Sequence, residues 1–214
     1  MINIQRFICN MLQENCYVVN DNTKECVIID CGAFYDNERN SIIEYIHKNE
    51  LKPVHLIATH GHLDHNFGNN TIYEVFSLEP EIAATDEQLM NNSAKQAKTF
   101  YGIELEYTLP KAKARLKGND IIKYGNQELT VLETPGHSQG SITLYDTRNH
   151  IAFTGDTLFK NSIGRTDFES GNMMQMIQSL RMLAQLPDET VIFPGHGAQT
   201  TIGEELANNP YMDR

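Results

Sequence analysis

The sequence Thr59-His60-Gly61-His62-Leu63-Asp64-His65 puts four side chains that can bind metal within six residues, directly after a strongly apolar run. Imidazole nitrogens and carboxylate oxygens are common ligands of zinc and related cations. In an extended or tightly turned loop, His60 and His62 can point the same way and bind one ion. Asp64 and His65 can then reach a second ion beside the first. The stretch therefore predicts one loop that contributes to two metal sites.

Three more residues of this kind follow downstream, each beside a glycine and after a β-rich segment. They are His137 in Thr134-Pro135-Gly136-His137-Ser138, Asp156 in Phe153-Thr154-Gly155-Asp156-Thr157, and His196 in Pro194-Gly195-His196-Gly197. The resulting five imidazoles and two carboxylates exceed what one tetrahedral ion can use, so the sequence predicts two ions in one site. We expect His137 to complete the first ion's ligands and His196 the second's, with Asp156 bridging ions roughly 3.5–4 Å apart.

Length and composition predict an ordinary globular protein. The chain has 214 residues, 40% of them hydrophobic, and no apolar stretch long enough to span a membrane. No linker, low-complexity run or internal repeat divides it, so we expect a single domain over residues 1–214. Residues 1–10 lack a signal-peptide pattern, and we therefore expect a cytoplasmic protein without a membrane partner.

The net charge argues against nucleic acid as a partner. Lys plus Arg is 17 and Asp plus Glu is 28, which gives a formal charge of −11. An acidic surface repels phosphate backbones, and no basic cluster with interleaved aromatic residues is present in the sequence. We interpret the acidity as a contribution to solubility, and the number of subunits stays open.

Residues outside this set are interpreted structurally. All four cysteines lie within the first 31 residues at spacings that match no CxxC zinc pattern, and we interpret them as reduced core thiols: Cys9, Cys16, Cys26 and Cys31. The three remaining histidines are interpreted as surface or core residues: His47, His55 and His150.

Hydrophobic periodicity predicts alternating strands and helices. The predicted β-rich segments are residues 4–19, 26–29, 54–58, 120–124, 129–133, 141–145 and 151–154, and the predicted helices are residues 37–50, 66–76, 86–101 and 172–186. The histidine cluster then lies in a strand-to-helix loop, where catalytic groups are usually presented. Residues 86–110, with Phe100, Tyr101 and Tyr107, either form part of a pocket rim or pack on the core, and packing is the commoner role of aromatic residues.

His60-Gly-His62-Leu-Asp64-His65, followed by His137, Asp156 and His196, resembles the metallo-β-lactamase superfamily over nearly the whole chain. The resemblance implies an α/β fold, an αβ/βα sandwich of two mixed β-sheets flanked by helices. It also implies one metal on His60, His62 and His137, a second on Asp64, His65 and His196, and Asp156 between them. The zinc β-lactamases often carry a cysteine near the position of Asp156 and are exported, and neither feature is present here.

Finer motifs resemble the short bacterial hydrolases that are similar to glyoxalase II. They are Gly155-Asp156-Thr157-Leu158-Phe159, Gly164-Arg165-Thr166-Asp167-Phe168, Pro194-Gly195-His196-Gly197 and Thr200-Thr201-Ile202-Gly203-Glu204-Glu205 with Asn209-Pro210. Glyoxalase II continues into a C-terminal helical extension that binds glutathione, and this chain does not contain that extension. In glyoxalase II, the loop near the metals usually has an aromatic residue two positions after the basic residue, where this chain has Asp167. Arg165 is the candidate for binding a substrate carboxylate, and a structural pair with Asp167 is the other interpretation.

These features predict a metal-dependent hydrolase of small-molecule thioesters of the hydroxyacylglutathione type. We expect two divalent ions, zinc first with iron or manganese as alternatives, and a bridging hydroxide as nucleophile. Asp64 and Asp156 are the predicted catalytic carboxylates. A thiol with a pKa of roughly 8–9 leaves without much help from an acid, which suits a site with no dedicated acid. The alternatives are a persulfide dioxygenase with a single iron, a hydrolase of another ester or lactone, and a metal-stabilised binding protein.

Overall fold

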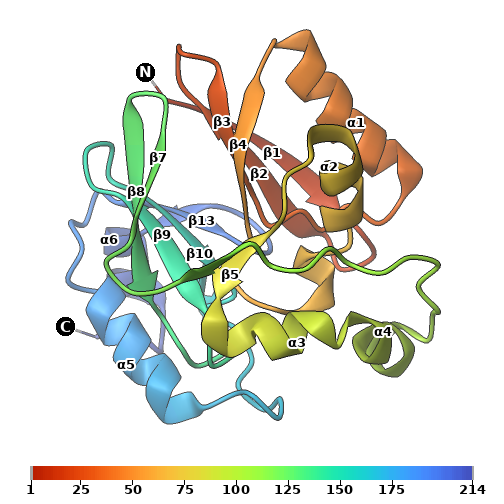
Figure 1. The fold of residues 1–214 in the computed structure, drawn as a ribbon. Coiled ribbons are helices and arrows are strands. Elements are labelled where there is room, and N and C mark those ends of the chain that lie inside the picture. The colour runs from red at the N-terminus through yellow and green to blue at the C-terminus, as the bar shows by residue number, and fades with distance from the viewer. Residues whose placement is uncertain (1, 214) are drawn as a thin grey trace.

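Two six-stranded sheets lie face to face in the computed structural model, which describes residues 2–213 (Figure 1). Met1 and Arg214, the ends of the predicted domain 1–214, lie outside the described residues. The first sheet has the order β1 (Asn3–Cys9), β2 (Glu14–Asn20), β3 (Glu25–Ile29), β4 (Lys52–Ile57), β5 (Glu81–Ala83) and β6 (Ala114–Leu116). The second has the order β14 (Thr200–Thr201), β13 (Val191–Pro194), β10 (Ile151–Gly155), β9 (Ile142–Asp146), β8 (Gln127–Glu133) and β7 (Ile121–Tyr124). A separate pair consists of β11 (Leu158–Phe159) and β12 (Ser162–Ile163).

Helices cover the outer face of each sheet (Figure 1). The first sheet carries α1 (Asp36–Lys48) and α2 (Asn69–Phe76), and the second carries α5 (Met173–Leu183) and α6 (Ile202–Asn208). Each sheet contains both parallel and antiparallel pairs, for example β3 with β4 and β2 with β3 in the first sheet. This arrangement confirms the predicted αβ/βα sandwich of two mixed sheets flanked by helices.

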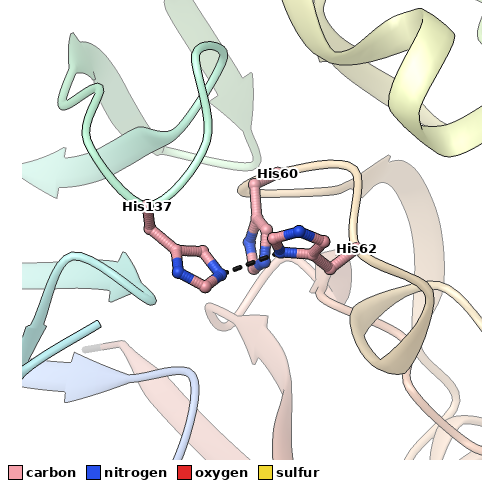
Figure 2. Close-up of side chains that lie close together, drawn as sticks. All are labelled: His60, His62 and His137. Atoms are coloured by element: carbon pink, nitrogen blue, oxygen red, sulfur yellow. Dashed lines mark hydrogen bonds between the residues drawn. The ribbon is translucent and has the colours of Figure 1, made fainter. Parts of the chain in front are cut away.

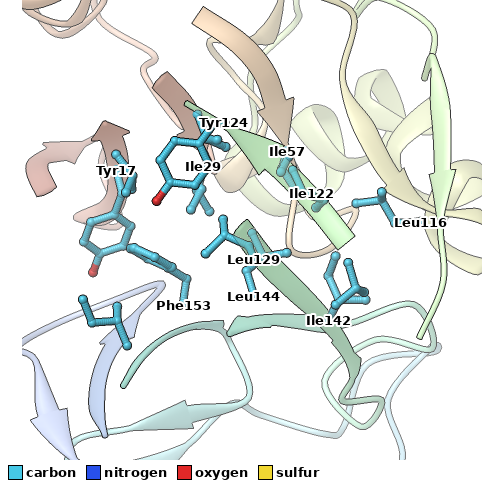
Figure 3. Packing of buried hydrophobic residues seen from close by; sticks show 14 of the residues in the cluster. Tyr17, Ile29, Ile57, Leu116, Ile122, Tyr124, Leu129, Ile142, Leu144 and Phe153 are labelled. Atoms are coloured by element: carbon cyan, nitrogen blue, oxygen red, sulfur yellow. The ribbon is translucent and has the colours of Figure 1, made fainter. Parts of the chain in front are cut away.

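Strand alternation divides the apolar residues between two cores. In β2, Tyr17 and Val19 face the second sheet, whereas Cys16 and Val18 face the helices. Successive side chains on a strand point to opposite faces, so a strand buried on both sides is apolar throughout. Figure 3 shows the core between the sheets, where the Tyr17 and Phe153 rings meet edge to face at 5.3 Å. The four cysteines are buried and form no disulfide, as interpreted from their spacing.

Most predicted elements are present, with differences at their ends. The β-rich segment 4–19 is a hairpin whose turn begins and ends with positive φ, 53° at Asn10 and 56° at Gln13. Pro53 lies inside β4 and coincides with a register shift against β3, because proline has no N–H to donate to the ladder. The helix predicted over residues 86–101 is wrong as a single element. It is instead α3 (Glu87–Asn91), α4 (Ser93–Gln96) and a π-helical turn, Ala97–Tyr101.

The strand directions bring the candidate ligands together. β8 and β10 both pair antiparallel with β9, and β13 pairs parallel with β10, so these three strands run the same way. Their carboxyl ends therefore meet at one edge of the second sheet. His137, Asp156 and His196 each lie in the loop after one of these strands, and residues 59–65 follow β4 of the first sheet. None of the helices in the described part of the chain is long and apolar enough to cross a membrane.

His55 connects the two sheets, and its hydrogen bonds lead us to predict that the stability of the fold depends on pH. Its Nδ1 donates to Glu81 Oε1 at 2.6 Å and its Nε2 to the carbonyl of Lys123 in β7 at 3.1 Å, so both ring nitrogens carry protons. The hydrogen bond to Glu81 raises the pKa of His55 above 6.5. Its stabilisation is therefore complete below the unfolded-state pKa and is lost as the pH rises through the folded-state pKa. We expect the thermal midpoint to fall more for His55→Gln at pH 5.5 than at pH 8.5, and an equal loss at both pH values would contradict this.

Candidate metal centre

All seven predicted ligands lie at the junction of the two sheets. His60 and His62 follow β4, the short 3-10 turn Leu63–His65 carries Asp64 and His65, and the other three follow strands of the second sheet. Figure 2 shows His60, His62 and His137 with their rings turned toward one another. The side chains are buried except for that of His196, which is partly exposed. The fold therefore collects residues that are up to 136 positions apart, from His60 to His196, into one buried volume.

One group consists of His60, His62 and His137. A nitrogen from each ring lies within 4.8 Å of the others, and His62 Nδ1 is 2.8 Å from His137 Nε2 (Figure 2). Burial, followed by the charge on His65 and His137, lowers the pKa of His60, and burial and His137 lower the pKa of His62 to about 4. Both rings are therefore neutral at pH 7 and have a lone pair available for a cation.

A second group consists of Asp64, His65 and His196. Asp64 Oδ2 is 3.3 Å from His196 Nε2 and 3.8 Å from His65 Nε2. Burial opposes ionisation of Asp64, but the neighbouring His65 and His196 outweigh it and lower the pKa of this carboxyl. An ionised carboxylate beside two imidazoles is a ligand set that zinc, iron or manganese can use.

The carboxylate of Asp156 lies between the two groups. Oδ1 is 3.3 Å from His65 Nε2, and Oδ2 is 3.5 Å from His137 Nε2 and 3.8 Å from His196 Nε2. Burial raises the pKa of this carboxyl, but His65 and His137 more than compensate, so the pKa lies well below 3.8. The position is the one expected of a group that contacts two ions at once.

Three of these atoms make no hydrogen bond among the described residues, although His65 Nε2 and Asp156 Oδ1 lie 3.3 Å apart as an ion pair. His60 Nε2, His65 Nε2 and Asp156 Oδ1 are buried and accept or donate no hydrogen bond within residues 2–213. An unsatisfied buried polar atom costs about 1–3 kcal/mol, and more if it is charged. Three such atoms pointing at one another fit the presence of cations between them.

Contacts behind the rings fix which nitrogen faces the site. His137 Nδ1 donates to the Arg165 carbonyl at 2.8 Å, and His196 Nδ1 donates to the Leu12 carbonyl at 3.1 Å. His65 Nδ1 lies 3.1 Å from Asp30 Oδ2. Each contact leaves Nε2 of that ring directed at the site, as is usual for metal-binding histidines.

Glycines beside the ligands leave no room for a side chain. A Cβ on Gly195 would lie 2.4 Å from Asp156 Oδ1 and 2.6 Å from the His65 ring. Gly155 has a φ of 49°, and a Cβ there would lie 2.2 Å from Thr59 Oγ1. These positions need glycine because the loops approach each other closely.

Sequence reasoning missed two carboxylates that hold the ligand loops. Asp30 accepts hydrogen bonds from Thr59 N and Thr59 Oγ1, both at 2.7 Å. Asp86 accepts from Gly61 N at 2.9 Å, Ser138 Oγ at 2.6 Å and Gly140 N at 2.7 Å. Asp86 therefore joins the loop of His60 and His62 to the loop of His137. Asp30 follows a buried strand and could have been suspected, but nothing in the polar sequence around Asp86 distinguishes it.

Two adjoining cavities open at the centre. The first, about 720 Å³, is lined by His62, Asp64, His137, Asp156 and His196 and by apolar side chains that include Met11, Leu12 and Phe159. The second, about 570 Å³, touches the ligand set at His62. Phe100 and Tyr101 line the first cavity, and the Tyr107 hydroxyl donates to the Phe67 carbonyl. Residues 86–110 thus fulfil both predicted roles, rim and packing.

Arg165 lines the first cavity but is already paired. Its Nε and Nη2 donate to the two carboxylate oxygens of Asp167 at 2.7 and 2.8 Å, and the guanidinium lies 4.2 Å over the Phe168 ring. Both side chains of the pair are exposed. The structural pair considered from the sequence is therefore present, and it leaves Nη1 of Arg165 for another partner.

Comparison with known proteins identifies the family. The sequence model of the family described as the metallo-β-lactamase superfamily matches residues 9–196 of this chain. The chain belongs to the metallo-β-lactamase superfamily. A relative from Haemophilus influenzae, "Hydroxyacylglutathione hydrolase GloC", is 34% identical over 216 residues, which cover 99% of this chain and 99% of the relative.

Two solved structures with the metallo-β-lactamase fold are similar to the structure of this chain. BLEG-1 B3 metallo-β-lactamase has a TM-score of 0.89 and 28% identity, covering 99% of this chain and 100% of its own. TTHA1623 in a di-iron-bound form has a TM-score of 0.87 and 30% identity, covering 97% of this chain and 100% of its own. The metallo-β-lactamase fold binds divalent metals, and the unpartnered histidine and aspartate atoms described above fit such ions.

Asp86 provides a test of how the ligand loops are held. Asp86→Asn places an NH₂ group against either the Gly140 or the Gly61 backbone N–H, because each carboxylate oxygen accepts from one of them. We expect metal content and activity to fall by about 10–100-fold, the usual effect of losing such a supporting contact. Ser138→Ala is the matched control, since it removes the hydroxyl contacts with Asp86 and Ser141 but leaves both backbone N–H bonds to Asp86, and it should retain most of the metal. Equal metal content in both variants, measured by elemental analysis, would show that Asp86 does not position the ligands.

Proposed function

We propose that this protein is a metal-dependent hydrolase of thioesters of the hydroxyacylglutathione type. The observation that carries the proposal is the Asp156 carboxylate between two groups of histidine and aspartate ligands. The similarity to GloC of H. influenzae supports the substrate class. Two divalent ions would be held by His60, His62 and His137, by Asp64, His65 and His196, and by Asp156 between them.

When bound, such ions lower the pKa of water so that a nucleophile is available at neutral pH, and they polarise a carbonyl oxygen. Asp64 and Asp156 keep their charge in this site because the surrounding histidines lower the pKa of both carboxyls. Asp64 also faces the first cavity, where its carboxylate can orient the attacking water and accept a proton from that water. The two carboxylates are therefore the proposed catalytic residues.

The residues near the ligands favour a good leaving group. Burial and the neighbouring Asp64 raise the pKa of Tyr101, so its hydroxyl keeps its proton at neutral pH and is a weak acid toward a leaving group. The remaining polar groups of the first cavity include the paired Arg165 and the ligands themselves. An amine leaving group needs a proton, whereas a thiolate leaves without one because its pKa is about 8–9. A thioester is therefore the substrate class that this set of residues serves best.

The direct test uses metal-replete protein and a panel of thioesters that includes S-D-lactoylglutathione. We expect turnover together with about two metal ions per chain by elemental analysis. Zinc is the first expectation, and the di-iron-bound form of the similar TTHA1623 makes iron the next to test. Oxygen uptake with glutathione persulfide and one iron per chain would favour the dioxygenase alternative, and absence of turnover of every thioester would reject the proposal.

Asp156→Ala tests the bridging role. The substitution removes the only carboxylate placed between the two described ligand groups. We expect metal content to drop and activity to decrease by orders of magnitude, while the circular dichroism spectrum stays that of a folded protein. The core between the sheets does not include this residue. Full activity with unchanged metal stoichiometry would rule out the bridge.

Arg165→Ala tests binding of a carboxylate on the thiol half of the substrate. We expect KM to rise about threefold to tenfold for thioesters whose thiol carries a carboxylate, with kcat and metal content unchanged, because the side chain is exposed. Asp167→Ala is the matched variant and should lower KM for the same substrates, since it releases the guanidinium from its present partner. If both substitutions leave KM unchanged, the pair is structural.

A further inference from the structure

The second cavity has a different chemical character from the first. The two cavities share His62, Gln96, Phe100 and Phe168 as lining residues, so they adjoin at the metal centre. The Phe100 and Phe168 rings, with centroids 5.7 Å apart, line both cavities. A substrate whose reacting carbonyl lies beside His62 can therefore extend into both cavities at once.

Four polar side chains that line the second cavity have no partners among the described residues. Asn92, Lys95, Thr99 and Gln139 line it and are exposed, and their side chains make no hydrogen bond or ion pair with any residue in the range 2–213. Lys95 is the single cation among the described lining residues. Asp86 also lines the cavity, but its carboxylate oxygens already accept three hydrogen bonds. The amide and hydroxyl groups of Asn92, Thr99 and Gln139 can donate or accept, and Glu169 is an exposed carboxylate on the same wall. The Lys95 ammonium is the free group that only donates, and it favours a ligand with an anionic acceptor.

The volume and position of the second cavity indicate that it takes the acyl half of a thioester and not the thiol half. Under the proposed function, Arg165 in the first cavity takes the thiol half, so the acyl half points to the second. At about 30 Å³ for each water, 570 Å³ corresponds to roughly nineteen waters. A three-carbon acyl group such as lactoyl fills only a small part of this space. The acyl group that fits is longer and ends in an acceptor.

We propose that the second cavity is an acyl-binding site for thioesters whose acyl chain ends in a carboxylate, with Lys95 as the residue that binds this carboxylate. The proposal rests on the proposed thioester hydrolysis and adds a specificity to it. Asn92, Thr99 and Gln139 donate hydrogen bonds to the same end of the acyl chain. An ammonium group binds a carboxylate through a charge-assisted hydrogen bond, which is stronger than a neutral one.

The test compares two acyl groups of equal length on one small neutral thiol, N-acetylcysteamine, with the metal-replete protein. We expect kcat/KM for the glutaryl thioester to exceed that for the valeryl thioester by about tenfold, the effect of one charge-assisted hydrogen bond. Lys95→Met should abolish this preference and leave turnover of the acetyl thioester unchanged. Lys98→Met is the matched control, because Lys98 is an exposed lysine three positions along the same helical segment and does not line the cavity.

Three results would overturn this assignment. They are an equal rate for glutaryl and valeryl thioesters, a preference that survives Lys95→Met, and a Lys95→Met effect that follows the thiol instead of the acyl group. In each of these cases the acetyl thioester is still hydrolysed. Failure to hydrolyse even the acetyl thioester would instead reject the proposed function, so the two failures are distinguishable.

Discussion

The burial of histidine nitrogens and carboxylate oxygens that make no hydrogen bond among the described residues is the constraint on which the rest of the site depends. His60 Nε2, His65 Nε2 and Asp156 Oδ1 face one another in the described part of the chain without a hydrogen bond. Folding removes these groups from water, and each unpaired group then costs free energy. Cations between them would convert this cost into binding energy, so metal binding and folding of the junction are expected to be linked.

Hydrogen bonds behind the ligand side chains and loops fix the geometry of the site. Backbone carbonyls of Arg165 and Leu12 accept from His137 and His196 and so select the nitrogen that faces the site. Asp30 and Asp86 hold the loop of His60 and His62 from two sides. The ligands come from two sheets, and their relative placement therefore depends on the core between the sheets as well as on these hydrogen bonds.

The candidate metal ligands and the residues that form the cavity walls lie on different parts of the fold. The ligands lie at strand ends that the sheets hold in place, whereas the cavity walls come from the β1–β2 turn, residues 85–101 and the loop around Phe168. Loops of this kind can vary without moving the strands. This separation fits the different names of two proteins that are similar to this chain, a B3 metallo-β-lactamase and a hydroxyacylglutathione hydrolase.

The sequence by itself determined the strands and helices and the set of ligand candidates, and its resemblance to the superfamily implied the sandwich fold. Alternating apolar residues define β8, and a continuous buried run defines β2. The cluster from His60 to His65 would be costly to bury without a cation. Only the tertiary structure decided the contacts between distant loops: Asp86 with Gly61 and Gly140, the His137 ring with the Arg165 carbonyl, and the polar cavity beside Lys95. The physical reason is that periodicity and local propensity act over a few residues. These contacts instead depend on where separate loops meet, and no short stretch of sequence records that meeting.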